Sequence, residues 1–577
     1  MKARAAVLAL AVLAAGCSLP LPRGVQVPGK VAAGQRQPRD IQVLPPGPRA
    51  DAKPIAVVTG FLGAQSNPDR QHAIARQFLT PARRTSWRDA GEVRVYDPRT
   101  LQVKEKAQLG DQSTVEVSAD VTGMIHPDGS YEAMAPAQLI EAYGLRRVDR
   151  GPWQLSDVPA GLRLSPADRD RSFRVRRTYF LAPSYAGGRP DHLVADQVLL
   201  PIQTDPAPSL VARLLSGPSR LLEGSVLSDV PAGTSARSVT TTAQGMVTVD
   251  LSAQVQQLPG AARQGLSAQL VWTLRQLGPA FSGLRLLVDG RPFRVPDTGA
   301  EQPSGEWEAY DPDGLGSEPP LSYLADHRLR AVGTSLPPGP ATSGSSTDAG
   351  SLPVDAVAVT PDGLGVALLT GGPPSTVQVR TGPLRALSYA APRVRLRGLT
   401  SPSWGSGEAG LWLLRGQDVL LLPAAGPARS VPLGRGVPAP LTSLAVSRDG
   451  ARLALVAGGR LFVGRVEHGG AGGIRVAGLL AIAPQLAGVT SVAWETGTSL
   501  VVLGRVRDAL LPVRVAVDGS SFDPLDGPGL PGPPTAVAAS PAGVWVTAGA
   551  GRAGRLYRLR GRGFDAGPFG SDPVYPG

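Results

Sequence analysis

Apolar positions change from helical to strand-like spacing between residues 54 and 168. Apolar residues recur every three or four positions over 55–62, and a second helical stretch begins at Pro68–Asp69 and ends at Thr80–Pro81. Alternating apolar and polar positions then predict strands at 92–96, 113–121 and 131–135. Two helices before an antiparallel set of strands indicate a small α+β domain over 54–168, with a cone-like sheet of the nuclear-transport-factor kind as the expected topology.

The next region, 172–296, alternates strands and helices. The predicted order is strand, strand, helix, strand, strand, helix, strand, with a turn at Gly187–Gly188 between the first two strands. Gly217–Pro218 ends the first helix, since glycine followed by proline is a common helix exit. The predicted elements span 176–182, 192–201, 210–215, 238–242, 247–251, 266–277 and 284–288. This pattern predicts an α/β domain.

The remainder, 305–577, repeats. Five segments share alternating apolar positions, a turn containing glycine and a second apolar run, and their equivalent positions lie 42 to 48 residues apart. Those positions are Val359, Trp404, Val446, Trp494 and Ala539. This period is the length of a four-stranded propeller blade, so we predict an all-β propeller with six blades. A hairpin at 321–331 and the stretch 555–560 are expected to complete one blade together.

The first twenty residues predict how the chain is held in the cell. Lys2 and Arg4 precede an apolar stretch, 5–15, that is too short for an ordinary membrane-spanning helix. Ala15–Gly16 then precede Cys17, the only cysteine of the 577 residues. We predict a lipoprotein signal peptide over 1–17 and a diacylglyceryl anchor at Cys17, with a secretory peptide cleaved elsewhere as the alternative. Two acyl chains would hold the protein on the extracytoplasmic face of the cell membrane.

Composition changes the picture in two ways. Residues 18–53 are rich in Pro, Gly, Gln and Arg, so they bury too little surface to fold and predict a tether. The 58 Lys plus Arg exceed the 46 Asp plus Glu by 12, which suits anionic lipids or wall polymers, whereas the export signal argues against nucleic acid. The densest basic run, 169–177, alternates with apolar residues and is expected to be the solvated face of a strand.

Candidate chemistry is sparse. The five histidines are far apart in sequence and none has zinc-ligand spacing: His72, His126, His192, His327 and His468. The serines Ser345 and Ser406 lack a nucleophile elbow. GPGLPG at 527–532 is expected to be a loop, and the Asp-rich turns at 311–314 and 361–363 offer too few oxygens for calcium. We predict no catalytic residue, metal or cofactor. The paired carboxylates of a glycosidase meet in space and not in sequence, so a glycosidase stays an open alternative at this point.

Taken together, the chain resembles the actinobacterial lipoprotein LpqB family over essentially its full length. The resemblance rests on GFLGAQSNPDRQHAIARQFLT at 60–80, Trp87 and the VYD at Val95–Asp97 for the N-terminal domain. For a GerMN domain it rests on RTYFLAPS, LVARLLSGP, VPAGT, VTVDLS, AQLVWTLRQL and LLVDG between 177 and 290. Ala14 stands where the lipobox usually has leucine.

This resemblance implies an accessory role rather than catalysis. It implies an extracytoplasmic partner of the sensor histidine kinase MtrB, tuning its signalling to the response regulator MtrA and thereby cell-envelope homeostasis and division. No catalytic residues come with it. The alternative from the residues is a protein that binds or hydrolyses a cell-wall polymer such as peptidoglycan or teichoic acid, motivated by the positive charge and the propeller.

Overall fold

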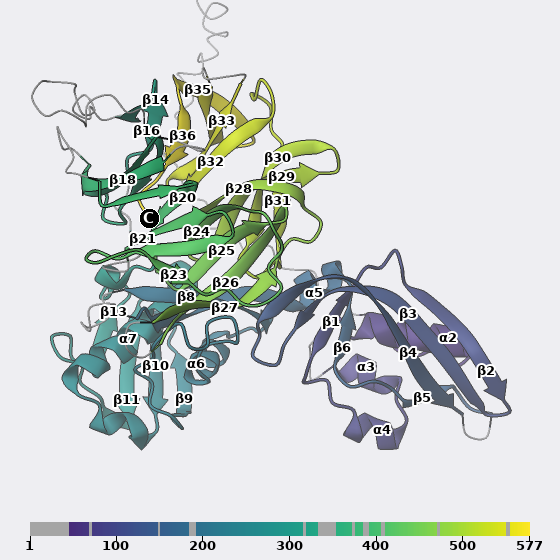
Figure 1. Cartoon of the computed structure of the whole chain (residues 1–577). Coiled ribbons are helices and arrows are strands. Elements are labelled where there is room, and N and C mark those ends of the chain that lie inside the picture. Colours follow the sequence, from purple (N-terminus) through teal and green to yellow (C-terminus); the bar gives the residue numbers. More distant parts are fainter. Residues whose placement is uncertain are drawn as a thin grey trace, which may run out of the picture. The chain divides into compact units, whose positions relative to one another are not determined.

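The structure is a computed structural model (Figure 1). It describes residues 45–67, 72–147, 150–183, 192–314, 319–332, 354–371, 376–384, 392–405, 410–469, 473–549 and 554–577. The predicted signal peptide, Cys17 and most of the predicted tether lie outside the described residues, as do Pro68–Asp69 and the turn at Gly187–Gly188. No helix within the described ranges is both long and apolar enough to cross a membrane.

The N-terminal part begins with helices α2 (Pro54–Ala64), α3 (Ala73–Gln77) and α4 (Pro81–Ser86). Helix α2 forms as predicted and buries Val58 and Phe61 in the core. The expectation that Thr80–Pro81 ends a helix is wrong. Thr80 instead begins α4, because its hydroxyl accepts a hydrogen bond from the Arg83 amide at 3.4 Å and proline suits the first helical position. The described residues therefore place three helices, not two, before the strands.

A six-stranded sheet follows, in the order β5-β4-β3-β1-β6 with β2 paired to β3. Its strands are β1 (Val93–Tyr96), β2 (Gln102–Leu109), β3 (Gln112–Ile125), β4 (Tyr131–Arg146), β5 (Gln154–Asp157) and β6 (Leu162–Leu164). The three predicted strands are confirmed, but β4 is much longer than predicted. The sheet is also mixed rather than antiparallel, because β1 and β6 run parallel. β3 alternates buried and half-buried positions, so one face covers the core beneath α2.

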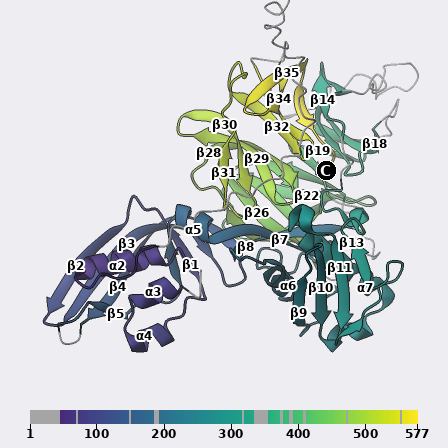
Figure 2. The ribbon, with the colours of Figure 1, turned by 180° about the vertical axis from the view of Figure 1, so that it is seen from behind.

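The middle part follows the predicted order of elements, viewed from behind in Figure 2. Its main elements are β7 (Phe173–Leu181), β8 (Leu193–Pro201), α6 (Ala207–Leu215), β9 (Ala236–Thr241), β10 (Met246–Leu251), α7 (Gly260–Arg275) and β11 (Gly283–Val288), followed by the short strands β12 (Arg291–Pro292) and β13 (Glu301–Pro303). β10 and β11 pair in parallel, as strands joined through a helix do. Helix α5 (Pro166–Ser172) precedes β7 and contains Arg169 and Arg171, so the basic run predicted as one strand is half helix.

Strands dominate the C-terminal part, which forms one three-stranded and five four-stranded sheets among the described residues. The sheets are β15-β14-β36, β16-β17-β18-β19, β20-β21-β22-β23, β24-β25-β26-β27, β28-β29-β30-β31 and β32-β33-β34-β35. The five predicted repeats each supply the first two strands of one four-stranded sheet.

The bounds of the first three sheets are β14 (Ser322–Ala325), β15 (Arg328–Ala331), β36 (Ser571–Val574), β16 (Val354–Val359), β17 (Gly365–Thr370), β18 (Thr376–Pro383), β19 (Val394–Arg397), β20 (Leu399–Trp404), β21 (Leu411–Arg415), β22 (Asp418–Leu422) and β23 (Arg429–Val431). Those of the other three are β24 (Leu441–Val446), β25 (Arg452–Ala457), β26 (Arg460–His468), β27 (Ile474–Ala481), β28 (Ala487–Thr496), β29 (Ser499–Val506), β30 (Ala509–Ala516), β31 (Phe522–Pro524), β32 (Pro534–Ser540), β33 (Gly543–Ala548), β34 (Arg555–Arg560) and β35 (Gly563–Phe569).

One assignment of strands to sheets is corrected. The predicted hairpin at 321–331 exists as β14 and β15, but the stretch 555–560 is β34 and belongs to the sheet of β32. The strand that pairs with β14 is β36, in which Ser571 lies opposite Leu324. The physical reason is that β34 follows β33 closely in the chain. The backbone groups of β34 therefore pair with β33 and are not available to the distant strand β14.

Candidate functional site

A cavity of 270 Å³ lies among the innermost strands of the C-terminal sheets. Its lining includes residues of β16, β20, β24, β28, β32 and β36, the first or last strand of each sheet. Small side chains dominate this lining, and the described lining residues include two charged ones, Arg448 and Asp572. Asp572 is the one carboxylate among the described lining residues, so this lining does not contain the carboxylate pair that a glycosidase uses.

Serine residues line the cavity at equivalent positions on three neighbouring sheets. Ser401, Ser443 and Ser491 each precede the aligned repeat position of their strand by three residues and line the cavity. Ala356 and Ala536 hold that level on two other strands. We call these five residues the serine ring. The repeats make it visible in the sequence, but only after the strands are aligned, which is why motif-based reasoning missed it.

Arg448 crosses one end of the same cavity. It follows β24 in the turn of residues 447–450, and its guanidinium donates to backbone carbonyls of Trp494, Ala539 and Pro576 at 3.3, 3.0 and 3.0 Å. These carbonyls belong to, or directly follow, three different strands, β28, β32 and β36. Burial lowers the pKa of Arg448. The side chain therefore joins several sheets at this end, whereas the serine ring lies three or more residues earlier along the strands.

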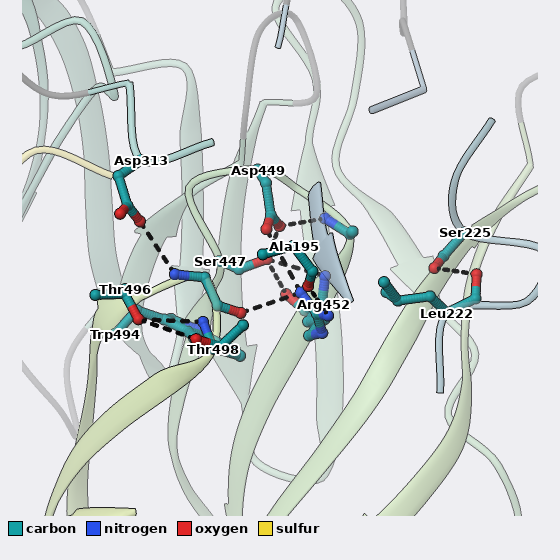
Figure 3. Close-up of polar contacts among 12 residues, drawn as sticks. Ala195, Leu222, Ser225, Asp313, Ser447, Asp449, Arg452, Trp494, Thr496 and Thr498 are labelled. Carbon is teal, nitrogen blue, oxygen red and sulfur yellow. Dashed lines mark hydrogen bonds and ion pairs between the residues drawn. The ribbon is translucent and has the colours of Figure 1, made fainter. Parts of the chain in front are cut away.

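The first residue of β25, which follows this turn, contacts the middle part of the chain (Figure 3). Arg452, 2% exposed, donates to the carbonyl of Ala195 in β8 at 2.6 Å and to the carbonyl of Gly497 at 3.1 Å. Its guanidinium also lies 3.5 Å from the carboxylate of the buried Asp449. Ser447 and the amide of Ala451 hold that carboxylate through its other oxygen. Because Ala195 and Asp449 are buried and Gly497 is half-buried, the guanidinium fixes β8 against this sheet with little access to water.

Further hydrogen bonds extend this junction. Asp313, after the middle part, accepts from the Gly497 amide at 3.1 Å (Figure 3). Arg177 of β7 donates to the Thr498 hydroxyl at 3.2 Å, and Gln197 of β8 donates to the Ser520 hydroxyl at 3.2 Å. The junction thus combines charged, polar and backbone groups, as a specific interface does rather than a loose contact.

Two fully buried carboxylates lie beside this junction. Asp196 accepts from the amide and hydroxyl of Ser219, both at 2.7 Å, while Asp518 accepts from the Ser520 amide at 2.9 Å. Burial raises the pKa of both aspartates. Both line a small cavity of 30 Å³, enough for about two waters, and the second oxygen of Asp518 is buried without a hydrogen-bond partner among the residues that the structure describes. This makes Asp518 an electrostatic cost in the folded chain at neutral pH.

The residues singled out from sequence do not come together. Cys17, Ser345 and Ser406 lie outside the described residues. His126 pairs with Glu132 at 3.0 Å and His327 lies 3.8 Å from Asp355, and the described part of the chain contains no group of three His, Cys, Asp or Glu side chains that would hold a metal.

The motifs dismissed as loops and turns behave as such. The GPGLPG stretch contains no helix, so it does not present amides to a phosphate. Asp362 accepts from the Leu364 amide at 2.9 Å and Asp311 from the Asp313 amide at 2.9 Å, which are ordinary aspartate turns. Arg448 and Arg452 were missed, and their signal is two arginines flanking Asp449–Gly450 where no other repeat has them.

Comparison with known proteins adds three family matches in chain order. Residues 47–170 match the family described as "Lipoprotein LpqB, N-terminal domain", 177–294 match "Sporulation and spore germination", and 338–576 match "Lipoprotein LpqB beta-propeller domain".

Full-length relatives agree with these matches. The chain is 29% identical to Lipoprotein LpqB of Thermobifida fusca, over 89% of this chain and 88% of the relative, and 29% identical to that of Rhodococcus jostii, over 93% and 90%. Among solved structures, TolB from Acinetobacter baumannii is 10% identical, covers 56% of this chain and 86% of its own, and has a TM-score of 0.35, too low to support an argument.

The fold and these matches define a class: a multidomain, strand-rich lipoprotein with a GerMN-like middle domain and a β-propeller-like C-terminal domain. Within that class the chain belongs to the LpqB lipoprotein family.

Proposed function

We propose that this protein is a non-enzymatic accessory lipoprotein that binds the extracellular domain of the sensor histidine kinase MtrB and modulates its signalling to MtrA. The observation that carries the proposal is the junction built by Arg452, which joins the GerMN-like domain to the propeller-like domain through buried hydrogen bonds. Two domains fixed in this way present one preorganised surface, so binding loses little conformational entropy.

We infer that the six C-terminal sheets are the blades of a closed propeller. The pairing of β14 with β36 would close the ring, and the carbonyl contacts of Arg448 would reinforce it from inside. Closure protects strand edges in all-β domains. We also infer a signal peptide over 1–17 and a tether over 18–53 from the sequence. We infer domains over 54–168, 172–296 and 305–577, and the family matches support these three domains.

We infer that the partner docks at the end of the cavity that carries the serine ring. Arg448 crosses the other end, and the turn that contains it contacts His192, which directly precedes β8. The small side chains and hydroxyls of the ring leave room for a protruding loop of a partner and offer it hydrogen bonds.

The lipid anchor would hold the protein at the outer face of the cell membrane, where a kinase ectodomain is accessible. Restricting the protein to two dimensions raises its effective concentration near the kinase. We expect Cys17→Ala to release the protein from membranes, as measured by fractionation of cells. Unchanged membrane retention of that variant would count against lipidation at Cys17.

Photocrosslinking in membranes tests the partner and the docking end together. A photoreactive side chain at Ser443, in the serine ring, is expected to capture the kinase ectodomain. The same side chain at Leu109, which is 86% exposed in the N-terminal part, is the control and should not. Equal capture from both positions would contradict the docking end, and no capture from either, together with no binding of the purified ectodomain, would contradict the kinase as partner.

A further inference from the structure

One face of the sheet β16-β17-β18-β19 carries a row of arginines. Arg395 and Arg397 lie on β19, the outer strand of the sheet, and Arg393 directly precedes it. All three side chains are exposed. They alternate with Val394 and Leu396, so they point to the same face of the strand. We call these three residues the arginine row.

The neighbouring strand extends this face with polar groups. Gln378 lies opposite Arg395 and Thr376 opposite Arg397 in the antiparallel pairing of β18 with β19, and directly opposed residues share a face. Arg380, two positions further along β18, adds a fourth arginine and donates to Gln378 at 3.1 Å. The proximity of Arg395, after burial, contributes to the lowered pKa of Arg380, which places like charges close together.

The other face of the same two strands is apolar and covered. Val377 and Val379 of β18 are buried, and Val394 and Leu396 of β19 pack in the same cluster with Leu411 of the next sheet. The strands are therefore anchored through one face, and the arginine row is held at fixed spacing on the other. Such a row is preorganised for a ligand, unlike arginines on a loop.

Neutralising acids are scarce around this row. Within the described ranges, the side chains of Arg395 and Arg397 form no ion pair, and the side chain of Arg393 donates to the carbonyl of Pro423 at 2.8 Å. Between residues 376 and 397 the sequence contains five arginines and no acidic residue. This concentration of one sign of charge exceeds the general surplus of the chain and attracts anions.

We propose that the arginine row binds a linear phosphodiester polymer. Successive arginines along an extended strand are about 6.6 Å apart, so a polymer that repeats its charge at regular intervals can contact each in turn. A guanidinium matches a phosphate with two parallel hydrogen bonds. Thr376 and Gln378 supply hydrogen bonds for the hydroxyl or ester oxygens between phosphates.

An acidic peptide fits this face less well. A peptide that adds to a strand edge gains specificity from pockets for its alternate side chains, whereas the positions beside the arginine row are threonine, glutamine and another arginine. A lipid headgroup surface would not require three arginines in line. The polymer is independent of the proposed kinase contact, which uses the serine ring.

The chain contains its own matched control. The tripeptide Arg-Leu-Arg occurs at 395–397 in β19 and again at 328–330 in β15, with both arginines exposed in each. The second copy borders a cavity of 680 Å³ that is also lined by Asp326, Asp355 and Asp572, so acids accompany it. Double substitution at either site removes the same net charge from the same kind of strand.

The test uses the full-length protein in detergent and fluorescently labelled poly(glycerol phosphate) of defined length, with affinity measured by anisotropy as a function of salt. The variant R395Q/R397Q is expected to bind about 30-fold more weakly, since two charge contacts are lost. Its slope of log affinity against log salt should fall by about 1.4. The variant R328Q/R330Q should change affinity less than about 2-fold under the same salt conditions.

Four results would overturn the proposal. The first is no saturable binding of the polymer by the unaltered protein, and the second is equal weakening of binding by the two double variants. The third is tighter binding of monomeric glycerol 3-phosphate or of phosphatidylglycerol vesicles than of the polymer. The fourth is tighter binding of poly-glutamate than of the polymer. Thermal unfolding of both variants alongside the unaltered protein establishes that each is folded, so loss of binding by R395Q/R397Q alone supports the proposal.

Discussion

The junction at Arg452 and the arginine row on β19 place the same residue type in opposite surroundings. Arg452 is almost fully buried, with carbonyl partners from distant parts of the chain and a carboxylate partner three residues away, whereas Arg395 and Arg397 are exposed without an ion pair among the described residues. A buried guanidinium whose donors are satisfied fixes geometry, and an exposed one that is held on a strand remains available to a ligand. The difference shows that net charge alone does not locate a binding surface in this chain.

Removing the buried arginine should have the largest effect. Arg452→Ala leaves Asp449 buried without its cationic partner and deprives the Ala195 carbonyl of its donor. Breaking a buried charge pair in this way costs about 3–5 kcal/mol, so the free energy of unfolding should fall by that amount in urea denaturation. A separate unfolding transition for the GerMN-like domain is also expected, since the junction is weakened and retains only its other hydrogen bonds.

Arg415→Ala provides the control for this prediction. Arg415 pairs with Asp418 at 2.9 Å, but both side chains are substantially exposed, and such surface pairs contribute about 0–1 kcal/mol. Similar destabilisation by the two variants would mean that Arg452 is no more than an ordinary surface arginine, and the comparison above would fail.

Replacing Asp518 should stabilise the protein, and the effect should depend on pH. Burial raises the pKa of Asp518 in the folded chain. The stabilisation that this shift gives the protonated carboxyl is fully present below the pKa of an unfolded aspartate, about 3.9. It is lost as the pH rises through the higher pKa of the folded chain. Asp518→Asn removes the buried charge and replaces the unpartnered oxygen with an uncharged NH2 group. We expect a gain of about 1–3 kcal/mol at pH 7 that shrinks toward pH 4 in chemical denaturation at each pH.

The exposed Asp508→Asn is the matched control and should change little between these pH values. If Asp518→Asn destabilised the protein equally at both pH values, the carboxylate would have a partner in solution, such as a cation or an ordered water network, that its neighbours do not supply.

A smaller effect is expected from two tryptophans that join neighbouring sheets. Trp404 and Trp494 occupy equivalent repeat positions, and each donates its indole N–H to a carbonyl of the preceding sheet, Ala358 at 3.1 Å and Ala445 at 2.9 Å. Tryptophan to phenylalanine at either position should cost about 1 kcal/mol for the hydrogen bond, plus some packing. Thermal unfolding should show similar losses for both, and clearly unequal losses would break the equivalence of the two repeats.

The sequence predicted the strands of the repeats well because period-2 alternation and glycine turns are local signals. It failed where one local signal has two meanings: Thr80–Pro81 ends one helical pattern and also begins α4. It also failed where pairing is distant, as when β36 rather than β34 joins β14.

The candidate site divides in the same way. The serine ring follows from aligning the repeats, whereas the Arg452 contact joins residues 257 positions apart and leaves no periodic trace. Lipidation of Cys17 stays a prediction.

The smallest effect should come from the arginine row itself. R395Q/R397Q should change the free energy of unfolding by no more than about 0.5 kcal/mol, because exposed side chains without partners contribute little to folding. Relief of repulsion with Arg380 would make that small change stabilising, and added salt, which screens such repulsion, should reduce it. Urea denaturation at low and high salt measures both the change in the free energy of unfolding and its dependence on salt. A loss of several kcal/mol would instead show that these arginines hold the sheet together as Arg452 holds the junction, and their availability to a ligand would then no longer follow from their exposure.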